Sequence, residues 1–325
     1  MTTDMAKKDA SSAGDPVEAP LTSESTEATD ASARPEPRFR VVDYAIILKP
    51  RVMSLVVFTA WVGLMLAPGS IGFEQSLVAV LCIAVGAGAS GAINMWYDRD
   101  IDIRMARTAN RPIPAGRMRA AEALVFGIVL SVGSVTTMWT WINAAAAVLL
   151  AVTILYYVFI YTMWLKRRTP QNIVIGGASG ALPPMIGWAA VTGDIGAGAL
   201  ALFTIIFLWT PPHSWALALF RKGDYENAGV PMMPVVAGVE ETKRQIVLYS
   251  VIMIAATFAP VGVGMSGWLY GIGVAALGVE FMRRAWKLMR EDGVTSARPL
   301  FFFSIMYLFA IFVLLLADKA LTHIL

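Results

Sequence analysis

The feature that most constrains this chain is a series of long apolar stretches that begins near residue 41. Each has roughly 17–25 residues, the length that crosses the hydrocarbon core of a bilayer as an α-helix. None alternates apolar and polar residues as a barrel strand does, and only helices or closed barrels satisfy their backbone groups in lipid. The sequence therefore predicts an all-α integral membrane protein whose nine transmembrane helices form a bundle, at residues 47–67, 75–97, 121–138, 142–164, 172–191, 197–219, 245–264, 267–286 and 299–317.

The composition agrees with this prediction and excludes several other classes. Only 15% of the 325 residues are charged and 57% are hydrophobic, whereas a soluble domain has about 25% charged residues. The single cysteine, Cys82, excludes an internal disulfide and a cysteine-built metal site, and we expect it to pack as a small hydrophobe. Two histidines, His213 and His323, are too few for a multi-histidine metal centre. No nucleic-acid partner is expected.

The basic residues predict the orientation of the chain. Of the 26 Lys and Arg, all but Lys319 lie before or at the start of the first apolar run, or near the ends of the second, fourth, sixth and eighth. Basic residues favour the cytoplasmic side of a membrane. We therefore expect a multi-pass membrane protein with a cytoplasmic N-terminus and with its C-terminus on the other side of the membrane.

The chain divides by composition into two parts. Residues 1–38 are rich in Ala, Ser, Thr, Pro and acids and have few large apolar side chains. Such a segment cannot bury enough surface to offset its ordering entropy. It also lacks the apolar core of a secretory signal and is too acidic for a transit peptide. The sequence predicts a disordered cytoplasmic tail over 1–38 and a nine-helix transmembrane domain over 39–325.

A charged stretch after the second apolar run carries the clearest chemical signal. Asn94, Asp98 and Asp102 are spaced four apart, so on a helix they share one face. Two carboxylates and an amide are hard oxygen ligands that suit Mg²⁺. Arg107 and Arg111 follow and could offer planar forks to phosphate oxygens. The alternative, a solvated helix cap with arginines that only set topology, explains the arginines but not the three oxygen ligands.

A second charged loop follows the sixth apolar run, at the same predicted membrane face. Asp224 could act there with the first set of acids around one diphosphate, with Lys222 taking part of the charge. Alternatively, Asp224 only pairs with Arg221 or Lys222. Lys166 and Asn172 lie between the fourth and fifth runs. They could add phosphate donors at the same mouth, or could be an interfacial cation and a helix cap.

The remaining polar candidate within an apolar run is His213. It follows Pro211 and Pro212, a pair expected to break or kink the helix and free backbone carbonyls. His213 could bond one of these carbonyls. Alternatively, it could line a cavity, either as a ligand to a metalloporphyrin iron or as a hydrogen-bond partner of a substrate.

Small and aromatic residues predict how the helices pack. The small-residue run 86–92 would place the end of the second helix, and the polar motif after it, inside the bundle. Gly176 and Gly180 have the spacing of a close helix contact. Tyr157 and Tyr161, near a span end, are expected to belong to the interfacial aromatic belt.

Three long strings, at residues 94–116, 166–194 and 209–238, resemble those of the intramembrane (UbiA-type) prenyltransferase superfamily. Within it they look like the protoheme IX farnesyltransferase, or heme O synthase, branch. The resemblance covers roughly residues 41–320. Asn94, Asp98 and Asp102 match the superfamily motif NxxxDxxxD.

The resemblance implies transfer of a farnesyl group from farnesyl diphosphate to a vinyl group of protoheme IX (heme b). Addition of water would complete the reaction, giving heme O and diphosphate. The superfamily's second DxxxD is incomplete here, because Phe220 stands four residues before Asp224, although Glu226 could substitute. The implied cofactor is Mg²⁺. The implied roles are catalysis by Asp98, Asp102 and Asp224, metal binding by these three and Asn94, diphosphate binding by Arg107, Arg111, Lys166 and Lys222, and contact with heme or substrate by His213 and Asn172.

The implied partners are farnesyl diphosphate, protoheme IX and the lipid bilayer, with heme O handed to a heme A synthase or terminal oxidase. The resemblance implies a bacterial inner (plasma) membrane, with the C-terminus periplasmic and the active site facing the cytoplasm. Two alternatives remain open at this point: a prenyltransferase for another acceptor (a quinone precursor or chlorophyllide), and a transporter. Transporters place their charged or broken sites near the bilayer midplane, whereas the acids here gather at one predicted face.

Overall fold

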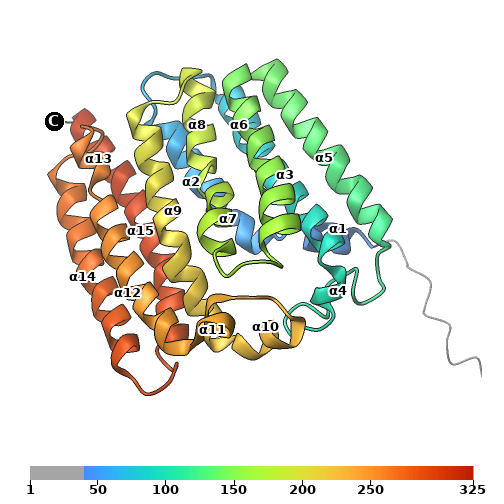
Figure 1. The fold of residues 1–325 in the computed structure, drawn as a ribbon. Helices are drawn as coiled ribbons and strands as arrows, with labels where there is room; N and C mark the ends of the chain where they lie inside the picture. The colour runs from blue at the N-terminus through green and yellow to red at the C-terminus, as the bar shows by residue number, and fades with distance from the viewer. Residues whose placement is uncertain (1–39, 325) are drawn as a thin grey trace, which may run out of the picture. The chain divides into compact units, whose positions relative to one another are not determined.

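A computed structural model describes the backbone of residues 40–324 and the side chains of residues 40–321. The tail predicted over residues 1–38 lies outside the described residues and stays a prediction. Every regular element of the described part is a helix (Figure 1), which confirms the all-α class. The helices are α1 (Val41–Ile47), α2 (Pro50–Leu66), α3 (Phe73–Tyr97), α4 (Arg99–Asp102), α5 (Ala120–Trp141), α6 (Ala144–Leu155), the π-helix η1 (Tyr156–Leu165), α7 (Asn172–Ala181), α8 (Pro183–Thr192), α9 (Ala197–Phe220), α10 (Lys222–Ala228), α11 (Met233–Val236), α12 (Gly238–Ala256), α13 (Ala259–Gly262), α14 (Trp268–Arg290) and α15 (Ala297–Ile324).

Each apolar run predicted from the sequence is helical in the structure. The predicted runs at 47–67, 142–164, 172–191 and 245–264 each fall on two consecutive helices instead of one. In the described part, 7 helices are long and apolar enough to cross a membrane, and up to 8 if α1 and α2, bent by 55°, form one span. α14 is not among these because its second half is rich in charged side chains. The count of nine spans therefore stays a prediction.

The interior of the helical bundle is built by α3 and by the pair α7–α8. The most apolar window of α7–α8 is 72% buried and that of α3 is 56% buried, against 22% for the peripheral α5. Small residues permit this close packing. An added Cβ at Gly63 of α2 or at Gly187 of α8 would collide with the backbone of the facing helix. Cys82 is buried in an apolar cluster as predicted.

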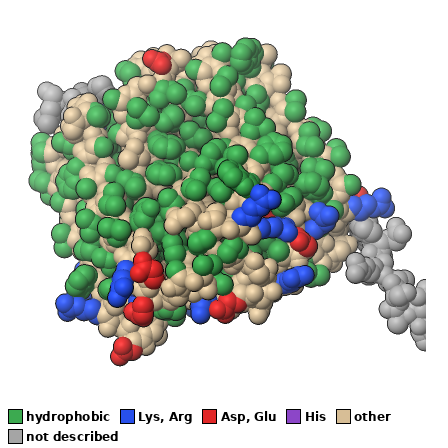
Figure 2. Space-filling view, in the orientation of Figure 1, with side chains coloured by type: hydrophobic (Ala, Val, Ile, Leu, Met, Phe, Trp, Pro, Cys, Tyr) green, Lys and Arg blue, Asp and Glu red, His purple; other side chains and the backbone are tan. Residues whose placement is uncertain are grey.

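Charged side chains gather at one end of the bundle. In Figure 1 this end carries α4, α10, α11 and the α14–α15 connection, whereas α15 ends on the opposite side. Figure 2 shows the blue and red side chains mainly along that end and a wide apolar surface above it. At the other end, Lys319 donates to the carbonyl of Met65 at 2.7 Å. The basic residues are thus segregated as the sequence indicates, while the side that faces the cytoplasm stays a prediction.

The structure corrects the prediction about proline pairs. Of the break or kink expected at Pro211 and Pro212, the break is wrong, because α9 continues as one helix through both residues. Helix α9 packs on α7, α12 and α15, and these contacts hold it together where two backbone donors are missing. The break occurs instead at Pro183 and Pro184, where α8 begins. Proline is favoured in a first helical turn, whose N–H groups have no intrahelical partner.

Candidate functional site

The three residues of the polar motif lie where α3 passes into α4. Asn94 is in the last turn of α3, Asp98 caps it, and Asp102 ends α4. The Asp98 N–H donates to the Asn94 carbonyl at 2.9 Å and the Asp102 N–H donates to the Asp98 carbonyl at 2.8 Å. Helical spacing therefore continues across the junction. The three residues are only 3%, 0% and 0% exposed, so their side chains belong to the interior.

Each of the three residues of the motif is paired with a cation through one of its side-chain oxygens. Lys166 forms an ion pair with Asp98. Arg111 lies 2.6 Å from Asp102, and the Lys49 ammonium donates to the Asn94 amide oxygen at 2.8 Å. Buried carboxylates require such compensation, because removing a charge from water is costly.

One oxygen of the motif is left without a partner. Asp102 Oδ1 is buried and has no hydrogen-bond partner in the described part of the chain. A buried acceptor without a donor is rare in a folded protein. The two carboxylate groups of Asp98 and Asp102 and the amide oxygen of Asn94 are all hard oxygen donors. This donor chemistry fits Mg²⁺.

The motif opens into a polar chamber of about 330 Å³. Its lining includes one carboxylate, Asp102, but four cationic side chains, so an anion with several charges suits it. Tyr225 of α10 also lines this chamber, and burial raises the pKa of its phenol, which therefore remains an O–H donor at physiological pH. The four cationic residues that line the chamber are Lys49, Arg107, Arg111 and Lys166.

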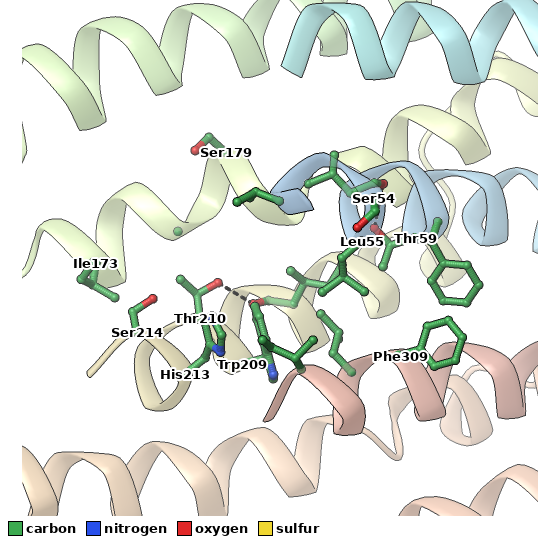
Figure 3. Close-up of a pocket in the computed structure, with 18 of the residues that line it drawn as sticks. Ser54, Leu55, Thr59, Ile173, Ser179, Trp209, Thr210, His213, Ser214 and Phe309 are labelled. Carbon is green, nitrogen blue, oxygen red and sulfur yellow. Dashed lines mark hydrogen bonds between the residues drawn. The ribbon is translucent and has the colours of Figure 1, made fainter. Parts of the chain in front are cut away.

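An apolar cavity of about 820 Å³ adjoins the polar chamber. Helices α2, η1, α7, α9 and α15 supply its walls, and Figure 3 shows Leu55 and Thr59 of α2 facing Trp209 and His213 of α9 across it. The two spaces are neighbours, since one set of residues lines both. These shared residues are Val52, Val56, Tyr157, Tyr161, Ile173, Ser179 and Gly180.

His213 presents a flat aromatic wall to the apolar cavity. Its ring stacks on Trp209 with centroids 4.1 Å apart, and on Phe301 at 4.6 Å. Its Nδ1 lies 2.7 Å from Ser304 Oγ, and that hydroxyl donates to the Phe301 carbonyl at 2.6 Å. Because a hydroxyl has one proton, His213 Nδ1 must be the donor to Ser304. Nε2 then keeps its lone pair. The alternative that His213 bonds a carbonyl freed by a helix break is wrong.

Four predicted site residues lie outside the lining of both cavities: Asp98, which is fully buried behind the lining, and Asn172, Lys222 and Asp224. Asp224 is 3.8 Å from Arg221, and its Oδ2 has no hydrogen-bond partner among the described residues. Lys222 pairs with Glu226 at 3.2 Å. Asn172 is buried, begins α7 and donates to the carbonyl of Thr169, so its side chain does not cap the helix, whose N-cap is Gln171. Across the described part, no three His, Cys, Asp or Glu side chains converge to hold a metal, so the structure does not bring Asp224 together with Asp98 and Asp102.

Several residues of the site were not predicted as such. In the sequence Lys49 indicates only topology, and the prediction that Tyr157 and Tyr161 belong to an interfacial belt is wrong, because both line the two spaces. The four-residue spacing of the two tyrosines was the available signal for a common helix face. Gly176 packs against Tyr161 as expected of a close contact, whereas an added Cβ at Gly180 meets nothing within 4 Å.

This fold and this pairing of a charged chamber with an apolar cavity define an intramembrane enzyme class. The family model of the UbiA prenyltransferases matches residues 56–310. The chain belongs to the UbiA prenyltransferase family.

More specific relatives share a single name. The chain is 61% identical to the protoheme IX farnesyltransferase of Parvibaculum lavamentivorans, over 86% of this chain and 89% of that one. It is 55% identical to the protoheme IX farnesyltransferase of Sinorhizobium fredii, over 91% of this chain and 92% of that one.

Solved structures agree at the level of the fold. A digeranylgeranylglyceryl phosphate synthase matches with a TM-score of 0.71 at 18% identity, over 85% of this chain and 97% of that one. A UbiA homologue from Archaeoglobus fulgidus bound to GPP and Mg²⁺ matches with a TM-score of 0.60 at 17% identity, over 84% of this chain and 99% of that one.

Proposed function

We propose that this protein transfers the farnesyl group of farnesyl diphosphate to a vinyl group of protoheme IX, with addition of water, to give heme O and diphosphate. The observation that carries the proposal is the shared lining of the two neighbouring spaces in a chain whose relatives are named protoheme IX farnesyltransferases. A donor with a charged head and an apolar chain needs both environments side by side, and a large flat acceptor needs the apolar one.

The polar chamber suits the diphosphate of the donor. Arg107 and Arg111 supply guanidinium groups and Lys49 and Lys166 supply ammonium groups along its wall. Such groups stabilise the negative charge that grows on the leaving oxygen. Asn94, Asp98 and Asp102 would hold Mg²⁺, which when bound neutralises part of the diphosphate charge. Asp224 and Lys222 stay candidates for the outer side of the same site.

The reaction then needs a dry space for the departing chain. The bond between farnesyl C1 and oxygen breaks, and its electron pair leaves with the diphosphate. The vinyl π electrons form the new carbon–carbon bond, water adds to the cation produced on the acceptor, and one proton is released. An apolar wall that excludes water until this last step prevents hydrolysis of the farnesyl cation.

The acceptor would lie in the apolar cavity against α9 and α15. Trp209, His213 and Phe301 offer stacked flat rings to a porphyrin, and the lone pair on His213 Nε2 suits iron. Asn172, which lies next to the lining residue Ile173, remains a proposed substrate contact. We place the protein in a bacterial inner membrane with the chamber towards the cytoplasm, and we expect heme O to pass to a heme A synthase or terminal oxidase.

The function is tested by mass spectrometry of hemes extracted from cells that do or do not produce the protein. We expect heme O only in producing cells, and in purified membranes only when both farnesyl diphosphate and heme are supplied. Offering a quinone precursor or chlorophyllide in place of heme separates the other acceptors. Substrate flux without diphosphate release would instead identify a transporter and contradict the proposal.

Gly180→Leu tests whether the two spaces act together. A leucine side chain would occupy their junction without meeting the surrounding atoms at its Cβ. We expect the KM for farnesyl diphosphate to rise about tenfold, since crowding a cavity costs about 1–3 kcal/mol. The steady-state rate of diphosphate release measures this. Gly133→Leu is the matched control, because its Cβ also meets nothing but lies on exposed α5. Equal KM values for the two variants would exclude a donor crossing this junction.

A further inference from the structure

The π-helix η1 changes which side chains face the polar chamber. Its wide winding runs over Tyr156–Leu165, and the Lys166 N–H completes it by donating to the Tyr161 carbonyl at 2.9 Å. Lys166 comes nine positions after Tyr157 in the chain. In an α-helix of about 3.6 residues per turn these positions would make two and a half turns and put the two side chains on opposite faces. Hydrogen bonds between residues five apart give about two turns instead, so both reach the chamber.

The same winding brings Thr162 against the polar motif. Thr162 is 0% exposed, and its Oγ1 accepts a hydrogen bond from Asn94 Nδ2 at 3.2 Å. Asn94 Nδ2 also donates to Asp98 Oδ2 at 2.7 Å. A primary amide has two N–H groups, and both are therefore used.

These two bonds fix which end of the Asn94 amide faces the chamber. With its nitrogen held by Asp98 and Thr162, the amide turns its oxygen towards the Lys49 ammonium at 2.8 Å. If the amide rotated by half a turn, N–H groups would point at any cation in the chamber, and nitrogen with bound hydrogens cannot ligate a metal.

We propose that Thr162 is a positioning residue that holds the Asn94 oxygen towards a bound divalent cation. The inference rests on the proposed function, in which Asn94, Asp98 and Asp102 hold Mg²⁺. Hydrogen bonds to a ligand orient it, and their loss typically lowers metal affinity by about 10–100-fold. Thr162 itself contributes no ligand and does not contact the substrate.

The test measures Mn²⁺, an oxygen-liganded substitute for Mg²⁺, by electron paramagnetic resonance with a non-hydrolysable farnesyl thiodiphosphate. Thr162→Val keeps the side-chain shape but removes the acceptor, and we expect about tenfold weaker Mn²⁺ binding. Thr162→Ser restores the acceptor and should bind within about twofold of the wild type. Thr242→Val is the matched control, since Thr242 is also 0% exposed but its hydroxyl bonds only its own helix, at the Gly238 carbonyl.

The outcomes separate this inference from the proposed function. Wild-type Mn²⁺ affinity in Thr162→Val, with loss of affinity in Asn94→Ala and Asp98→Asn, would overturn the role of Thr162 and leave the metal site standing. Unchanged Mn²⁺ binding in all three variants would overturn both. If Thr162→Val is not recovered in folded form, Thr162→Ala gives the same comparison, since it also lacks the acceptor.

Discussion

Asp98→Asn is expected to lower the rate of heme O formation by about 1000-fold, the upper end for removal of one electrostatic group from an active site. Asp98 is 0% exposed and its charge compensates Lys166 and Arg167. The uncharged amide of the substituted side chain would leave the charges of these two cations uncompensated. It would also weaken the binding of any divalent cation held with Asn94. Initial rates in membranes with excess Mg²⁺, normalised to the amount of inserted protein, measure the effect. We expect the same for Asp102→Asn.

Asp100→Asn provides the matched control, two residues further along the chain. The Asp100 side chain is 56% exposed and pairs with Arg167 at 2.7 Å. The hydrogen bond from Arg167 holds the pKa of the Asp100 carboxyl below its usual range. Exposed pairs of this kind contribute little, so activity should stay within about twofold of the wild type. Heme O formation by Asp98→Asn at a rate near that of Asp100→Asn would remove Asp98 from the site.

His213→Ala is expected to weaken heme binding by about 100-fold, which is about 2.8 kcal/mol at 1.4 kcal/mol per tenfold change. The variant loses both a stacked ring against Trp209 and Phe301 and the Nε2 lone pair proposed to meet iron. Titration of heme into the purified protein, followed at the Soret band, should show a weaker and shifted spectrum. Binding of inorganic diphosphate should be unchanged, because the polar chamber does not include His213.

Ser304→Ala separates ligation from packing in this prediction. It removes the acceptor for His213 Nδ1 but leaves the imidazole and its Nε2 in place. We expect the Soret position of the wild type and an affinity reduced by only about threefold, or about 0.7 kcal/mol, in the range for one hydrogen bond. Spectra and affinities identical to the wild type in both variants would exclude His213 as a heme contact.

The sequence was sufficient for the positions of the helices and for the common spacing of the polar motif. Apolar length alone placed each run, and the spacing of Asn94, Asp98 and Asp102 survives the junction of α3 and α4 because the backbone hydrogen bonds continue across it. Hydropathy could not show the winding of η1, since a π-helix has no composition of its own. Tyr157 and Tyr161 were therefore given to the membrane interface, although they line the site.

Tertiary packing decided what the local pattern left ambiguous. Two proline pairs look alike in the sequence, but only Pro183–Pro184 starts a new helix, while α9 carries Pro211 and Pro212 within its length. The place of Lys49 in the lining of the polar chamber also depends on tertiary structure. Its φ of 54° is a left-handed conformation that directs the chain at the bend between α1 and α2. A basic residue beside a span otherwise suggests only topology.

Beyond their shared lining, the two spaces have walls built by different parts of the chain, and this affects how such an enzyme can diverge in evolution. The charges around Asp102 lie on the loops that follow α1, α4 and η1, whereas the flat wall at His213 lies on α9 and α15. An inherited change on α9 or α15 alters the cavity wall proposed to meet the acceptor and leaves the charges proposed to bind diphosphate untouched. New acceptors can therefore arise by single substitutions on one wall, without an inactive ancestor in between.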